Sequence, residues 1–186
     1  MLSDLQQRKI ERMFEILDTD ANGYIEPSDL VRLAGAVATA VGLRPTSPEF
    51  EAIRWRYLAS WDEARPFFDR RGRVGREDYL RYHEQLVSMP AAFESRMRSL
   101  ADFVFSLLDA DGDGRITQDE LSRFQQAHGV PESLSRMIFP LLDLDGDGHV
   151  SAAEMREMLP QYFLSADPAE PGNWLFGPIE VPIEAR

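Results

Sequence analysis

Hydrophobic residues in this chain recur at helical spacing, in short blocks separated by polar segments that contain glycine. The clearest blocks flank residues 109–120 and 143–154. Within a block they fall at i, i+3, i+4 and i+7, which places them on one face of an amphipathic helix. The pattern therefore predicts helix–loop–helix twice, with apolar positions Leu100, Phe103, Val104, Leu107 and Leu108, then Leu121 and Phe124, then Leu134, Met137, Ile138, Leu141 and Leu142, then Met155, Met158, Leu159 and Tyr162.

The first half of the chain repeats this arrangement around residues 18–29 and 67–78. Its helical positions are Ile10, Met13, Phe14 and Leu17, then Leu30, Leu33, Ala34, Val37 and Val41, and finally Tyr79, Leu80, His83, Leu86 and Val87. A unit that recurs along a chain indicates a repeat architecture. We expect an all-α fold with four helix–loop–helix units in two pairs, packed into a compact globule. The expected divisions are residues 1–89, residues 90–164 and a tail, residues 165–186.

The segments 109–120 and 143–154 both match the twelve-residue pattern D-x-[DN]-x-[DN]-G-x5-E of a calcium loop. Calcium prefers six to eight oxygen ligands, which such a loop supplies from positions one, three and five, from the carbonyl at position seven and from the Glu at position twelve. Glycine at position six permits the sharp turn. The expected side-chain ligands are Asp109, Asp111, Asp113, Glu120, Asp143, Asp145, Asp147 and Glu154, with the carbonyls of Arg115 and His149.

Residues 18–29 form a third candidate loop, in which the last ligand is shorter. Asp18, Asp20 and Asn22 offer side chains and Tyr24 a carbonyl, but position twelve is Asp29 rather than Glu. An Asp reaches an ion with one oxygen more readily than with two, and fewer ligands favour magnesium, which requires six at about 2.0–2.1 Å. We therefore expect three calcium sites, the first of them able to hold magnesium.

Residues 67–78 keep the spacing of such a loop without its ligands. Gly72 and Val74 stand at positions six and eight, but Phe67 and Arg71 occupy positions that require oxygens. Arginine has no lone pair to donate and repels a cation, so we expect no metal here. Paired loops share a short antiparallel bridge through their eighth residues. We expect Ile25 to face Val74, and Ile116 to face Val150.

Charge and composition restrict the classes of function. The net charge is −12, and eleven carboxylates at the expected ligand positions account for nearly all of it. Without a basic face, nucleic acid is not an expected partner.

No cysteine is present, which excludes thiol chemistry. The longest apolar stretch is too short to span a membrane, and no secretory signal is visible. We expect a cytoplasmic monomer whose partners are calcium ions, with no membrane association; the sequence does not identify a target protein.

Catalysis has little support in the sequence. The three histidines, His83, His128 and His149, lie on separate elements. No nucleophile motif, phosphate-binding glycine loop or zinc spacing accompanies them. His83 lies on an apolar helix face, where a histidine is more often a core residue than a ligand. We expect no catalytic residues and no enzyme.

Four units with an inactive second loop resemble a known group of the EF-hand superfamily. The chain is similar over its whole length to sarcoplasmic calcium-binding proteins and to the bacterial calerythrin-like proteins, with calexcitin nearby. The segment Pro171–Pro178, which contains Trp174, Leu175 and Phe176, is similar to the tail of the bacterial group. The resemblance implies two EF-hand pairs packed against each other and a role in calcium buffering or transport.

Buffering and sensing are the two remaining roles. A sensor opens on binding calcium and exposes a methionine-rich groove that takes a target helix. Only 7 methionines occur, whereas the first half is rich in aromatic residues, which suit a fixed core. The apolar tail could also fill the cleft that a target would otherwise occupy. We expect a cytoplasmic calcium buffer, and keep as the alternative a sensor that changes conformation and binds a target protein.

Overall fold

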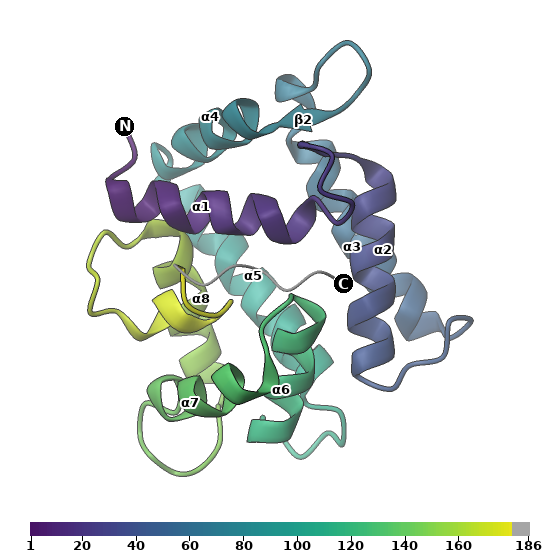
Figure 1. Ribbon diagram of the computed structural model, residues 1–186. Coiled ribbons are helices and arrows are strands. Elements are labelled where there is room, and N and C mark those ends of the chain that lie inside the picture. Colours follow the sequence, from purple (N-terminus) through teal and green to yellow (C-terminus); the bar gives the residue numbers. More distant parts are fainter. Residues whose placement is uncertain (180–186) are drawn as a thin grey trace.

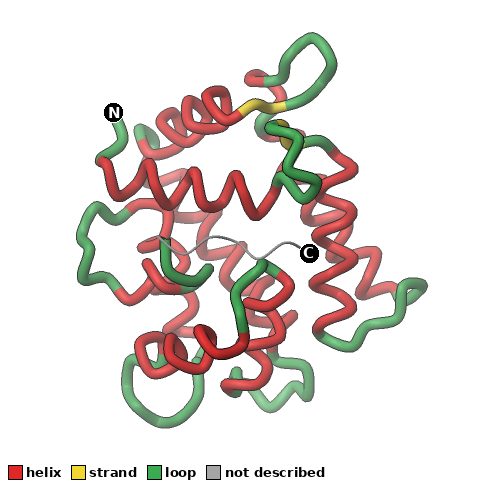
Figure 2. Tube along the Cα trace, viewed as in Figure 1, coloured by secondary structure: helices red, strands yellow, loops and turns green. Residues whose placement is uncertain are grey.

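The computed structural model describes residues 1–179, apart from the side chains of residues 60, 63 and 90–92, so the tail beyond 179 lies outside the described residues. Figure 1 shows the helices in chain order, and Figure 2 shows the loops that separate them. The helices are α1 (Asp4–Leu17), α2 (Pro27–Ala40), α3 (Pro48–Glu63), α4 (Arg76–Val87), α5 (Pro90–Leu108), α6 (Gln118–Ala127), α7 (Glu132–Leu142) and α8 (Ala152–Leu164). The predicted all-α architecture is confirmed.

Local capping fixes where several of these helices begin. The hydroxyl of Ser3 accepts a hydrogen bond from the backbone of Gln6, whose side chain in turn accepts from the Ser3 backbone. The same reciprocal arrangement opens α6 through Thr117 and Glu120. Each arrangement satisfies two backbone donors that a helix start leaves free. In α6 the capping glutamate is also the last residue of an acidic loop, so one side chain serves both the helix and the loop.

The loops meet in pairs through their eighth residues, as predicted. Strand β1 (Tyr24–Ile25) pairs antiparallel with β2 (Val74–Gly75), with Ile25 opposite Val74. An isolated antiparallel bridge joins Ile116 to Val150, with N–H···O distances of 2.9 Å in both directions. These apolar residues are at most 2% exposed. Backbone hydrogen bonds and buried side chains therefore hold each pair of loops together.

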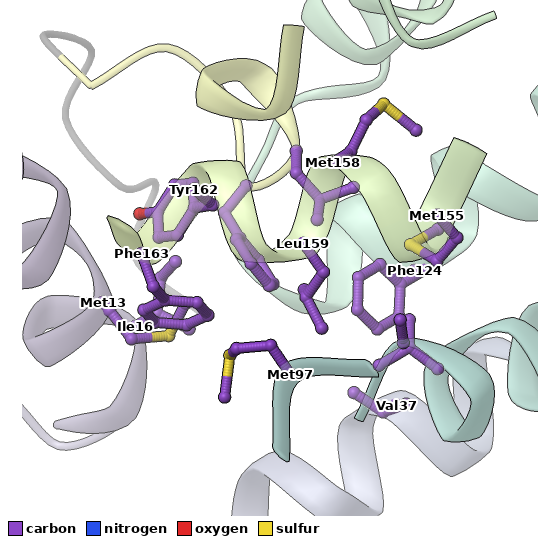
Figure 3. Close-up of a cluster of buried hydrophobic side chains, with 14 of the residues drawn as sticks. Met13, Ile16, Val37, Met97, Phe124, Met155, Met158, Leu159, Tyr162 and Phe163 are labelled. Atoms are coloured by element: carbon purple, nitrogen blue, oxygen red, sulfur yellow. The ribbon is translucent and has the colours of Figure 1, made fainter. Parts of the chain in front are cut away.

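Contacts also run between the first two units and the last two. Helix α1 packs against α8, and α2 packs against α6. The main hydrophobic cluster is continuous across the chain, with fully buried members on α1, α2, α5, α6 and α8. Figure 3 shows part of it, including Met13 and Ile16 of α1, Met97 of α5, and Leu159 and Phe163 of α8.

A buried lysine fastens α1 to the end of α8. The Nζ atom of Lys9 donates to the carbonyl oxygens of Gln161 and Ser165, at 3.0 and 2.8 Å, and to Oδ1 of Asn173 at 2.9 Å. In return, the hydroxyl of Tyr162 donates to the carbonyl of Lys9 at 2.9 Å. A cation near the last carbonyls of a helix is favourable because of the helix dipole. Burial lowers the pKa of Lys9 to about 8, while the nearby charge of Glu170 acts in the opposite direction.

The segment after α8 turns back onto the core through a short helix, η2 (Pro171–Trp174). Leu175 and Phe176 are 1% and 6% exposed, whereas Trp174 is 37% exposed. Phe176 packs against Tyr162 and His128, at ring-centroid distances of 4.9 and 5.6 Å. Leu175 and Phe176 therefore belong to the core, whereas Trp174 is partly exposed.

The close approach of the tail requires a glycine at one position. A Cβ atom on Gly172 would lie 2.2 Å from the carbonyl oxygen of Met158, which is far inside van der Waals contact. The Gly172 N–H donates to the side chain of Gln161 at 2.9 Å. The tail thus lies so close to the α8 backbone that a side chain at position 172 would displace the tail.

Membrane insertion has no structural support in the described part of the chain. None of its helices combines the length and the apolar character that crossing a bilayer requires.

Candidate metal centres

Three loops place carboxylates close together. In each of them, one oxygen from each of three aspartates lies within 4.8 Å of the others. The three groups are Asp18, Asp20 and Asp29; Asp109, Asp111 and Asp113; and Asp143, Asp145 and Asp147. Like charges at this separation repel, so each group is suited to a cation that neutralises it.

The same two backbone hydrogen bonds shape all three loops. The N–H at position six donates to the carboxylate at position one, at distances of 2.8, 3.1 and 2.9 Å for Gly23, Gly114 and Gly148. The N–H at position seven donates to the side chain at position five, at 2.9, 2.8 and 2.9 Å for Tyr24, Arg115 and His149. The loop backbone therefore orients the side chains before any ion binds.

The residue at position six has positive φ in every one of these loops, with values of +85°, +82° and +87°. Position four is also left-handed, and there the loops differ. Gly112 and Gly146 occupy it in the last two loops, whereas Ala21, with φ of +55°, occupies it in the first. A left-handed alanine is strained relative to glycine. The first loop adopts the common shape at a local conformational cost.

Glutamates at position twelve contact the start of their own loops. In the third unit, Oε1 of Glu120 accepts from the Ala110 N–H at 3.1 Å and Oε2 accepts from the Thr117 N–H at 2.8 Å. Burial alone would raise the pKa of Glu120, but these hydrogen bonds bring it below its usual value. In the fourth unit, Glu154 accepts from the backbone of Leu144 and of Ser151 in the same way. Both glutamates are thus directed across their loops.

Divalent cations fit the donor sets of the last two loops. The Oδ1 atom of Asp109 is buried and has no hydrogen-bond partner in the described structure. A carboxylate oxygen without a donor is costly to bury, and a metal ion would satisfy it. The donors are all oxygens, which suits a hard cation such as calcium better than a soft one.

The first loop holds an arginine that its sequence motif does not include. Arg32, one turn after the loop, forms an ion pair with Asp29 and another with Asp20, the second at 3.0 Å. Its Nε also donates to the hydroxyl of Thr19 at 2.8 Å. Asp29 is fully buried and accepts from that hydroxyl and from the Glu26 N–H, each at 2.8 Å. A guanidinium group therefore supplies positive charge to the carboxylates of this loop.

Burial is the main cause that raises the pKa of Asp18, and the nearby charges of Asp29 and Asp20 add to it. Glu26 occupies position nine of this loop. Its carboxylate lies 3.9 Å from Nε of Arg73 and is not part of the aspartate group. The loop thus gathers three aspartates, as the sequence suggested, but its surroundings include two arginines that the motif did not reveal.

Residues 67–78 carry an internal ion pair where a metal would otherwise lie. Asp69 accepts from the backbone of Arg71 and Arg73 at 2.7 and 3.0 Å, and from the Arg73 guanidinium at 3.0 Å. That guanidinium also lies 3.6 Å from the ring centre of Tyr24. Within the described residues, no group of three possible ligands occurs in this loop. Arg73 links the arginine-containing loop to the acidic loop beside it.

Comparison with known proteins agrees with this geometry. Residues 98–160 match the family model described as an EF-hand domain pair, and residues 10–34 match the model described as an EF hand. A probable calcium-binding protein from Oryza sativa subsp. japonica, CML16, is 32% identical over 115 residues, or 62% of this chain. The chain matches only 56% of the length of that relative.

Solved structures extend the likeness to the whole fold. A calcium-binding protein from Streptomyces coelicolor is 32% identical, with a TM-score of 0.70, and the match covers 85% of this chain and 97% of that one. A sarcoplasmic calcium-binding protein from amphioxus is 18% identical, with a TM-score of 0.73 and coverage of 95% and 98%. With its acidic loops, their paired bridges and this degree of likeness to a bacterial calcium-binding protein, the chain belongs to the EF-hand family of calcium-binding proteins.

Proposed function

We propose that this protein is a cytoplasmic calcium buffer with three cation sites, formed by residues 18–29, 109–120 and 143–154. The first site takes magnesium as well as calcium, because Asp29 offers a shorter reach than Glu and Arg32 competes for its oxygens. The arrangement divides into EF-hand pairs at residues 1–89 and 90–164, with the tail as a third part. The relatives are described as calcium-binding proteins, which supports a role in binding calcium. We propose no catalytic activity.

The packing of the tail is the observation that carries the buffering role. Leu175 and Phe176 fill apolar space beside α6 and α8, where the helix of a target protein would need to bind. Met155 and Met158, which an adaptable groove would expose, are fully buried. Lys9 and Tyr162 hold α1 against α8. Opening this assembly for a target would break a buried network and expose much of the core.

A sensor is the alternative, and one surface feature favours it. Met137 and Leu141 lie on α7 and Leu144 lies in the loop that follows it, and they are 72%, 46% and 39% exposed. The relative from Streptomyces coelicolor is described in terms of prokaryotic calcium-mediated regulation. A small apolar surface beside a calcium loop would suit a regulatory contact.

Calorimetric titration with calcium, with and without magnesium, tests the number and kind of sites. Three calcium sites without magnesium and two in its presence are expected. Equal affinity of all three sites under both conditions would contradict the assignment of the first loop.

Hydrogen exchange measured by mass spectrometry on residues 165–178 separates a buffer from a sensor. A buffer keeps the tail protected with calcium and with a chelator, because the tail is part of the core in both states. Loss of protection on adding calcium would show that the tail is released and would favour the sensor.

A further inference from the structure

A cavity of about 340 Å³ lies between the helices of the first two units and those of the last two. Its walls come from both sides, with Met13 and Leu33 on one and Met97, Phe124 and Phe163 on the other. Most of these side chains are labelled in Figure 3. Protein interiors contain few voids larger than a water molecule. This volume instead falls in the range of small-molecule sites.

One polar side chain of the cavity wall lacks any hydrogen bond. His83 of α4 is 6% exposed, and both of its ring nitrogens are buried without a partner in the described structure. Burial lowers its pKa to about 3, so the ring is neutral and offers one donor and one acceptor. Leaving both unpaired is unfavourable. A ligand in the cavity would give the imidazole a hydrogen-bond partner.

Aromatic rings surround this histidine. Tyr79, Tyr82 and Phe163 lie at ring-centroid distances of 4.4, 5.2 and 5.8 Å from it. Trp61 and Phe103 add further flat surface elsewhere on the cavity wall. Aromatic walls favour a flat ring system in offset or edge contact over a flexible chain.

The charges on the wall restrict the ligand further. The charged side chains that line the cavity are Arg56 and Arg96, and the described lining contains no carboxylate. The Arg56 guanidinium lies 5.5 Å from the ring centre of Phe103. The nitrogen Nη2 of Arg96 is 3.5 Å from the hydroxyl of Tyr82. A cationic ligand would meet positive charge on the described wall of the cavity.

We propose that this cavity is a binding site for one small, flat aromatic molecule that has no positive charge and forms a hydrogen bond with His83. The site is separate from the calcium loops, and it gives the chain a ligand-binding activity in addition to calcium binding. The proposal does not depend on whether the protein acts as a buffer or as a sensor.

Fluorescence titration with 6-propionyl-2-(dimethylamino)naphthalene tests it on the full chain. This probe is uncharged, flat and aromatic, and its carbonyl can accept a hydrogen bond. We expect saturable binding of one probe per chain with a blue-shifted emission. Absence of saturable binding, or a stoichiometry well above one, would overturn the proposal.

Two kinds of variant locate the bound probe. His83→Phe keeps a ring of similar size but removes both nitrogens, and should weaken binding about five- to tenfold. Leu100→Trp and Ala59→Phe place larger side chains in the cavity wall and should weaken binding at least tenfold. Near-ultraviolet circular dichroism and calcium calorimetry identify variants that remain folded. Unchanged binding in folded His83→Phe, or in both folded filling variants, would contradict the site.

A control variant and three competitors test the chemistry. Trp55→Ala removes an aromatic side chain that is 69% exposed and does not line the cavity, so binding should be unchanged. A loss of binding there would assign the probe to the surface. 2-Naphthol should displace the probe more effectively than 1-naphthylmethylammonium or dodecanoate. Stronger displacement by the cation or by the chain would overturn the assignment of a flat ligand without positive charge.

Discussion

The two pairs of loops share one backbone design but differ in what neutralises their carboxylates. In the C-terminal pair, Ile116 faces Val150 and each loop gathers three aspartates into one cluster of negative charge. In the N-terminal pair, Ile25 faces Val74 in the same way, but arginines contact the aspartates of both loops. The apolar bridge therefore preserves loop geometry whether or not the loop can bind a metal.

Two arginines account for this difference. Arg73 is part of its loop and pairs with Asp69, so it replaces a metal. Arg32 lies outside the twelve residues of its loop and pairs with Asp29 and Asp20 while all three aspartates remain in place. The loop of Arg73 has no described group of three possible ligands, whereas Arg32 faces a complete group of three aspartates for which an ion can compete. We therefore expect the charges facing a loop, and not only its motif, to set its metal affinity.

The largest expected effect is in the C-terminal pair, at Glu154. Glu154→Gln removes one charge and bidentate coordination, and should lower calcium affinity of the fourth loop on the order of 100-fold, or about 2.7 kcal/mol. Calorimetry should show one site fewer in the working range. Glu157→Gln on the same helix is the matched control, because Glu157 is exposed and lies outside the loop. Equal loss in both variants would mean that overall charge, not coordination, matters.

The apolar bridges provide the next test, through a comparison of Val150→Ala with Val74→Ala. Both side chains are at most 1% exposed, so each change should lower the free energy of unfolding by about 2 kcal/mol. Only Val150 joins two candidate metal loops. Val150→Ala should therefore also reduce the cooperativity between two calcium sites. An equal change in cooperativity from Val74→Ala would show that the bridges do not transmit binding, and urea unfolding with calcium calorimetry measures both quantities.

Motif spacing and apolar periodicity were sufficient to predict the repeat, the all-α fold and both bridges. The repeat and the helices follow from residues that are close together in the sequence, and the bridges follow from the pairing of eighth residues in neighbouring loops. Residues such as Gly114 and Val150 therefore indicate these features directly. Arg32 was missed because the loop pattern ends at Asp29. The helical path of α2 brings the Arg32 guanidinium back to the carboxylates of the loop. One signal was available: on a helix, the side chain three residues after Asp29 lies on the same face.

The cavity and the packing of the tail depend on contacts that sequence periodicity does not specify. The apolar face predicted for α4 placed His83 correctly in the interior. The apolar face could not show that the His83 imidazole lacks a described hydrogen-bond partner. The surroundings of the imidazole depend on how side chains of α5 and α8 pack beside α4. Similarly, the apolar tail suggested burial, but only Leu175 and Phe176 are in the core, and Trp174 remains partly exposed.

A histidine comparison between the two halves gives a test of pH dependence. His128 is hydrogen-bonded, through Nδ1 to the Phe124 carbonyl and through Nε2 to Tyr57, at 2.8 and 3.3 Å, whereas His83 has no hydrogen-bond partner among the described residues. The pKa of buried His83 is about 3, against about 6.5 in an unfolded chain. Below pH 6.5 only the unfolded state binds the proton, so the free energy of unfolding falls as pH falls towards 3.

At pH 5.5 this linkage should remove about 1.4 kcal/mol of stability relative to pH 7.5. His83→Phe lacks the titrating group, so its loss over the same range should be smaller by that amount. Urea unfolding of both proteins in chelator, at the two pH values, measures the difference. Parallel losses would show that His83 is protonated to the same extent in the folded and unfolded states.

The smallest and most specific effect concerns Arg32 and the first loop. Arg32→Ala removes the guanidinium from Asp29 and Asp20, so a metal ion no longer has to displace it. Because Arg32 is partly exposed, its pairs are screened, and the gain in calcium and magnesium affinity should be about fivefold, or about 1 kcal/mol. Arg54→Ala is the matched control, since it removes an exposed arginine that pairs with Glu51, away from the loops. If Arg32→Ala weakens binding instead, the guanidinium positions Asp29 for the ion rather than competing with it. The N-terminal loop would then resemble its C-terminal counterparts more closely than its charges suggest.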